Sequence, residues 1–300
     1  MNRISIFKYV VSFSVPLFVL LGVVFILGGT IYFAYSFVSN PIRQYGNVFG
    51  YYRRLYHATY CPYLKEGDRY YTKITKAVEY RVSRDGITTI APFTVYAYRP
   101  RSSAGEEALR NISASVLLNG SPNVMYAEQS MMGTDGSSFT LRSNKPLKSG
   151  DLISFRVDYI QYGLHAVCQE ELDAYKNLPD LVDDTRTKLV RERNVEYVYA
   201  SPSYSVKYLI EVIFPQGYPW KTLESVQEMA IISLSSKPVD KDTMNKIAKV
   251  RVEDNKLRLE YKHNFRSAHG HYLLWRLPKM DKLNRYALSV AGAKANVAGN

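Results

Sequence analysis

Cysteine and tryptophan are both scarce in this chain, at two residues each among 300. Two cysteines cannot build a disulfide scaffold, and no Cys-x-x-Cys pair is present to hold zinc. A single disulfide between Cys61 and Cys168 would suit an exported domain. The alternative is two free thiols that fill apolar space. The sequence leaves this choice open.

Sequence motifs of the common enzyme classes are absent. The chain has no GxxxxGK(S/T) phosphate loop, no GxGxxG, no HExxH and no GxSxG. His263, His269 and His271 come closest to a metal site, but the sequence between the last two is typical of a turn. The acidic residues from Glu170 to Asp184 lack the alternating oxygen ligands and central Gly of an EF-hand loop. We therefore predict no metal, no cofactor and no catalytic residue, and expect a protein that is not an enzyme.

Charge is absent from the stretch between Tyr9 and Asn40. A helix rises about 1.5 Å per residue, so about 20 apolar residues cross a bilayer core of about 30 Å. This run is longer than the apolar core of a signal peptide, and a poor cleavage site follows it. We therefore predict that residues 1–40 hold a short tail and a retained transmembrane helix. The predicted anchor residues include Val15, Phe18, Leu20, Phe25, Ile31 and Phe37.

Basic residues flank this run on both sides, so the positive-inside rule gives little direction. Arg3 and Lys8 precede it, and Arg43 follows it. A very short basic N-terminus before a single span usually stays in the cytoplasm. On that ground we expect the rest of the chain to lie outside the cytoplasm.

Aromatic residues recur at three- and four-residue steps between Pro41 and Tyr60, a spacing typical of one helical face. We therefore predict that residues 41–70 form a juxtamembrane amphipathic segment, with a helix in the headgroup region of the bilayer. The alternative is a helix that packs its aromatic face on the following domain. The predicted membrane-interface residues are Tyr45, Phe49, Tyr52, Arg53, Arg54 and Tyr56.

From Tyr71 onward the apolar residues alternate with a period of two, which is typical of strands. We therefore predict that residues 71–166 form a first β-rich unit. Within it, residues 77–82 and 87–98 flank Asp85-Gly86 and predict a hairpin. Residues 112–118 and 152–162 predict further strands, and residues 123–131 predict a short edge strand.

Residues 167–200 break the strand pattern with a charged, helix-favouring insert. Its charge is segregated, with acidic residues up to Asp184 and basic residues from Arg186. Such an insert is a surface excursion or a partner-binding arm on a rigid β-scaffold. Its candidate partner-binding residues are Asp180, Asp183, Asp184, Arg186, Arg191 and Arg193.

Residues 201–290 predict a second β-rich unit, in which Glu253 to Lys256 closes a hairpin, and residues 291–300 form a polar tail. The predicted fold is thus mainly β: an N-terminal transmembrane helix, then an antiparallel β-sandwich-like region with a helical insert. The two β-rich stretches form one large unit or two small ones.

The composition favours a binding protein over an enzyme. The net charge is +12 and the chain holds 26 tyrosines, which suit sheets and interfaces. Because the basic residues are spread along the chain, we expect no nucleic acid, and no small-molecule substrate is indicated. The leading hypothesis is a non-enzymatic single-pass membrane protein whose β-region is an interaction module in a larger membrane or envelope assembly. Its expected partners are the lipid bilayer and other protein subunits, contacted through Tyr-rich strands and the charged insert.

Two other hypotheses stay open. One is a cytoplasm-facing, membrane-anchored sensor or effector that binds a small anionic ligand through Lys and Arg. The other is an envelope enzyme that acts on glycan. A basic concave pocket would favour the first, and a pocket with paired carboxylates would favour the second.

Overall fold

The computed structural model describes residues 48–96, 109–131, 136–176, 195–200, 205–222, 231–233, 248–261 and 271–285. Among these residues, none of the helices is long and apolar enough to span a bilayer. The predicted transmembrane helix, Tyr45 and the polar tail lie outside the described residues.

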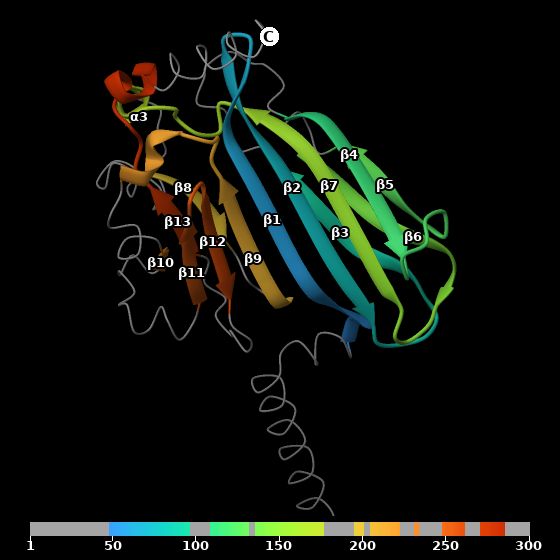
Figure 1. Ribbon diagram of the computed structural model, residues 1–300. Coiled ribbons are helices and arrows are strands. Elements are labelled where there is room, and N and C mark those ends of the chain that lie inside the picture. The colour runs from blue at the N-terminus through green and yellow to red at the C-terminus, as the bar shows by residue number, and fades with distance from the viewer. Residues whose placement is uncertain are drawn as a thin grey trace, which may run out of the picture.

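A seven-stranded sheet, here called the large sheet, forms the centre of the molecule (Figure 1). All its pairings are antiparallel except that of β1 with β9, which is parallel. In order across the sheet, its strands are β11 (Ala248–Glu253), β12 (Lys256–Tyr261), β9 (Ser205–Ile213), β1 (Tyr51–Glu66), β2 (Arg69–Val82), β7 (Leu152–Tyr162) and β4 (Leu109–Leu118).

Two three-stranded sheets pack on one face of the large sheet. The first contains β3 (Ile87–Tyr96), β6 (Gly136–Leu147) and β5 (Met125–Met131), and Figure 1 shows β3 behind β2 and β7. The second contains β10 (Ile231–Ser233), β13 (His271–Trp275) and β8 (Glu196–Ala200). The helix α3 (Gln169–Lys176) follows β7, and the 3-10 helix η1 (Pro219–Thr222) follows β9.

Aromatic contacts join these layers. Phe155 of β7 packs against Phe93 of β3 and Phe139 of β6, with ring centroids 5.5 and 5.6 Å apart. Phe214, just after β9, packs edge-on against Trp275 of β13 at 5.6 Å. Both small sheets therefore contact the same, inner face of the large sheet, and the core lies between the layers.

The period-two pattern places apolar residues on that inner face. In β2, for example, Ile74, Val78 and Tyr80 are all buried. Many tyrosines also lie in the core instead of forming a contact surface as the composition suggested: Tyr51, Tyr60, Tyr63, Tyr80, Tyr159, Tyr208, Tyr218 and Tyr261.

The mainly β prediction is confirmed, with few helices and several antiparallel pairings. The large sheet takes strands from both predicted β-rich stretches, since β1 lies directly beside β9. The hairpin at Glu253 to Lys256 is confirmed, and β5 is an edge strand as predicted. The described helix of the insert is α3, and residues 196–200 form β8 instead of a helix.

Two sequence predictions are wrong. Residues from Tyr51 onward form β1 and not an amphipathic helix, so Tyr52, Arg53, Arg54 and Tyr56 lie in a sheet ladder with β2 and β9. The predicted hairpin around Asp85-Gly86 has the right strands but the wrong pairing. There, β2 pairs with β1 and β7, whereas β3 crosses to the first small sheet and pairs with β6.

Candidate interaction surface

The face of the large sheet away from the small sheets is here called the outer sheet face. The strand register aligns its side chains in rows: Thr59 lies beside Thr75 and Glu211, and Glu211 lies beside Arg258. Alternation from the buried positions then assigns the remaining residues to this face.

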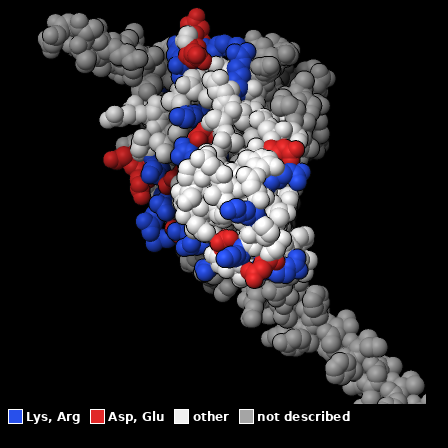
Figure 2. Space-filling view, turned by 90° about the vertical axis from the view of Figure 1, so that its right-hand side faces the viewer, with Lys and Arg blue, Asp and Glu red and all other residues white. Residues whose placement is uncertain are grey.

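Lys and Arg outnumber Asp and Glu on the outer sheet face. Figure 2 shows the outer sheet face edge-on at its left margin, where charged side chains gather. The centre of that view is mostly uncharged. The basic residues of the face are Arg54, Arg69, Lys73, Arg81, Arg110, Arg156, Lys207, Lys249, Arg251, Lys256 and Arg258, and the acidic ones are Glu66, Glu79, Asp158, Glu211, Glu253 and Glu260.

Glu211 is the centre of an ionic network on this face. One carboxylate oxygen lies 2.8 Å from His57 Nε2, and the other lies 3.7 Å from both Lys256 Nζ and Arg258 NH1. The network continues from Arg258 to Glu260, and from Glu260 to Lys207 at 3.3 Å. Because the Glu211 side chain is only 9% exposed, these partners replace the contacts with water that it loses by burial.

A second group lies on β7. Arg156 donates two hydrogen bonds to Asp158, at 2.7 and 2.9 Å, and Thr75 donates a third. The hydrogen bond from Arg156 lowers the pKa of the Asp158 carboxyl, and the bond from Thr75 acts in the same direction. The Asp158 carboxylate thus stays ionised and accepts three hydrogen bonds, so it is a structural group and not a proton carrier.

The far end of the face, away from the start of β1, carries an aromatic and basic cluster, here called the Tyr162 cluster. The guanidinium carbons of Arg69 and Arg110 lie 4.7 and 5.5 Å from the ring centroid of Tyr162, and Tyr71 packs at 5.8 Å. The hydroxyl of Tyr162 donates to Glu66, and this bond raises the tyrosine pKa. Tyr and Arg are the residue types enriched in protein interfaces.

The residues predicted for the membrane interface have several environments. Phe49 is 49% exposed, next to Val48 at 55%, whereas Tyr56 stacks on Tyr208 with ring centroids 4.6 Å apart. Arg53 lies over the Tyr56 ring, and Arg54 is 3.9 Å from Glu79. Of the predicted set in the described residues, Phe49 alone is an exposed apolar side chain beside the predicted anchor.

The two cysteines are free thiols, so the disulfide alternative is wrong. Cys61 lies on the outer sheet face opposite Lys73, whereas Cys168 is buried in the core on the other side of the sheet. Burial raises the pKa of both thiols, which lowers their reactivity near neutral pH.

The other predicted site residues are not brought into this surface. The candidate partner-binding residues from Asp180 to Arg193, together with His263 and His269, lie outside the described residues. Within the described part of the chain, no three His, Cys, Asp or Glu residues are grouped to hold a metal ion.

Sequence reasoning missed the His57–Glu211 network. The two residues are 154 positions apart, and only the parallel pairing of β1 with β9 brings them together. An acidic residue in the otherwise apolar second half of β9, residues 208–213, is the signal that could have identified Glu211 as a paired, buried charge.

No protein-family model and no curated protein sequence matches this chain. A suggested nutrient binding protein of Legionella pneumophila is similar in structure, with 8% identity and a TM-score of 0.40, over 76% of this chain and 67% of its own. A suggested protease of Parabacteroides distasonis has 8% identity and a TM-score of 0.39, over 76% and 41%. An M1 zinc metallopeptidase of Deinococcus radiodurans has 9% identity and a TM-score of 0.33, over 74% and 42%. Likeness at this level carries no argument about activity.

Proposed function

We propose that this chain is a non-enzymatic, single-pass membrane protein whose β-region is an interaction module in a larger membrane or envelope assembly. The outer sheet face binds an acidic surface of another protein subunit. The observation that carries this proposal is the surplus of Lys and Arg on a broad sheet face that neither small sheet covers. Complementary charge steers association and fixes the orientation of partners.

The length of β1 supports an orientation for this module. The strand has 16 residues, which at about 3.3 Å per residue spans about 50 Å. Its first residue follows the exposed Val48 and Phe49, close in sequence to the predicted anchor. The membrane-proximal end is therefore at the start of β1, and the Tyr162 cluster lies at the membrane-distal end. On the topology expected from the sequence, this end points away from the cytoplasm.

The arrangement of the charged side chains on the outer sheet face suits the binding of a partner protein. Glu211 and Asp158 are each held by two or more partners within the sheet, so they rigidify the face. The exposed Lys73 and Arg251 remain available at its surface. A rigid face loses little conformational entropy when it docks on a partner.

Charge reversal on the outer sheet face tests this proposal. The full-length double variant Lys73→Glu, Arg251→Glu should lose its partner, with recovery on co-purification reduced at least about tenfold relative to wild type. The matched control is Lys145→Glu, Lys148→Glu, which makes the same change of charge on exposed residues at the end of β6. The control should retain the partner. Equal recovery from the two variants, or equal loss, would contradict the proposed surface.

A further inference from the structure

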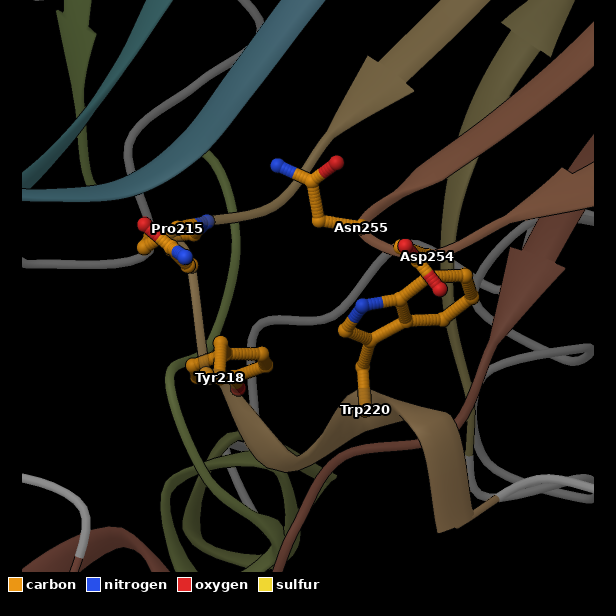
Figure 3. A pocket seen from close by; sticks show the side chains of 7 residues that line it. Pro215, Tyr218, Trp220, Asp254 and Asn255 are labelled. Carbon is orange, nitrogen blue, oxygen red and sulfur yellow. The ribbon is translucent and has the colours of Figure 1, made fainter.

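A cavity of about 300 Å³ lies at the end of β9, beside the turn between β11 and β12. Its walls come from two turns and from η1 (Figure 3). The lining residues are Pro215, Gln216, Gly217, Tyr218, Trp220, Asp254 and Asn255.

The turn that follows β9 and the turn between β11 and β12 are hydrogen-bonded to each other. Phe214 donates its backbone N–H to the Asn255 carbonyl at 2.8 Å, and the Asn255 side-chain amide donates to the Phe214 carbonyl at 3.1 Å. In the first turn, Tyr218 N–H donates to the Pro215 carbonyl at 3.0 Å, and Gly217 takes a φ of 77°. A positive φ at the third position defines a type II turn, which favours glycine. The cavity is therefore preformed.

Its aromatic wall is equally rigid. Trp220 stacks on Phe214 with ring centroids 4.3 Å apart, and Tyr218 stacks on Tyr63 at 4.5 Å. The Tyr218 hydroxyl donates to the Val167 carbonyl at 2.6 Å. Both wall residues are at most 2% exposed, so they fix the shape of the cavity and do not offer open ring faces.

One polar atom of this wall lacks a partner. The indole nitrogen of Trp220 is buried and donates to no group in the part of the chain that the structure describes. Figure 3 shows this nitrogen turned toward the space between Tyr218, Pro215 and Asn255. Buried donors nearly always have an acceptor, so an oxygen atom in the cavity would complete the site.

The other lining groups limit which class of ligand can supply that oxygen atom. Asp254 and Asn255 offer a carboxylate and an amide oxygen as acceptors, while Gln216 offers an exposed amide. Among the described residues, no Lys or Arg lines the cavity, so none of them supplies a counter-charge for an anion. Hydroxyl groups both donate and accept, so one ligand can accept from the indole and also donate to a lone pair of the exposed Asp254 carboxylate.

We propose that this cavity binds a neutral polyhydroxylated ligand the size of one sugar residue. Small-molecule sites range from about 300 to 1,000 Å³, so this volume suits one small ligand and not a length of polymer. Asp254 is the single carboxylate among the described lining residues, whereas glycoside hydrolysis commonly uses a pair. The site therefore binds a sugar without cleaving it, a role that does not depend on the outer sheet face.

The test is a titration of the full-length protein in a detergent without a sugar headgroup, because alkyl glycosides would compete. Free hexoses and their methyl glycosides are the probes, and tryptophan fluorescence is the readout. Trp220 and Trp275 are the two tryptophans, and Trp275 already donates to Tyr63 at 2.8 Å. We expect a saturable change in fluorescence. Equal binding of the methyl glycosides would identify the end of a glycan as the source, and binding of free hexoses alone would identify a free monosaccharide.

Three variants complete the experiment. Trp220→Phe should abolish the saturable signal, and Asp254→Asn should raise the Kd at least about tenfold. Asp68→Asn, an equal change at the exposed β1–β2 turn, should leave the Kd unchanged. A signal that never saturates for any probe would overturn the proposal, since solvent alone would then satisfy the indole. So would a Kd that Asp254→Asn leaves at the wild-type value.

Discussion

Lys76 is the residue whose position most conflicts with its chemistry. It lies on the inner side of β2, between the buried Ile74 and Val78, with its amine 5.6 Å from the ring centroid of Tyr159. Burial disfavours the charged amine and lowers the pKa of Lys76 to about 8. The charged form therefore destabilises the fold at neutral pH.

This predicts a pH dependence with a definite sign. The unfolded pKa is about 10.4, so between about pH 8 and pH 10 the unfolded chain binds more protons at this site than the folded one. The free energy of unfolding of wild type, relative to Lys76→Met, should therefore rise as the pH increases from about 7 to about 10. Denaturant titrations of the two proteins at both pH values measure this difference. Lys73→Met, on the exposed side of the same strand, is the control and should show no such trend.

At the scale of elements, β1 depends on the turn residue that precedes it. Gly50 has a φ of 77°, and its carbonyl accepts a hydrogen bond from Ser83 N–H at 2.8 Å. A Cβ placed there would lie 2.4 Å from Ile87 Cδ1, so the end of the Ile87 side chain would have to move. Gly50 thus fixes both the start of β1 and its approach to β3.

Gly50→Ala should accordingly destabilise the protein by about 1–3 kcal/mol, through overpacking and an unfavourable φ together. Gly67→Ala is the matched control. Gly67 also has a positive φ, of 58°, but a Cβ there meets nothing within 4 Å. Thermal denaturation of both variants should show the larger loss for Gly50→Ala. Equal losses would mean that contact with Ile87 has no part in the effect.

The sequence predicted strands better than it predicted their partners. β7 was predicted at its observed bounds because its residues alternate without interruption. β1 was mistaken for a helix because register shifts at Arg53/Leu55 and Cys61/Leu64 break its alternation. The crossover after β2 could not be predicted either, since Asp85-Gly86 suits a hairpin turn and a change of sheet equally. The outer sheet face follows from these pairings, so local sequence could not reveal it.

At the scale of the whole molecule, the proposed anchor decides where the β-region works. Removal of residues 1–40 should move the protein from the membrane to the soluble fraction after carbonate extraction. Weak, salt-sensitive binding of the truncated protein would instead indicate electrostatic attraction of the basic surface to lipid. Truncated protein that resists carbonate as the full chain does would contradict a single anchor.

The central claim is that the outer sheet face contacts another protein subunit at the membrane. Photo-cross-linking in intact cells tests it most directly, with the reactive residue placed at Lys73 on this face or at Lys145 on β6. We predict a discrete adduct from position 73 that weakens as salt is added to isolated membranes, and none from position 145. An adduct from position 145 alone, or the same adduct from both positions, would contradict the proposed interaction surface.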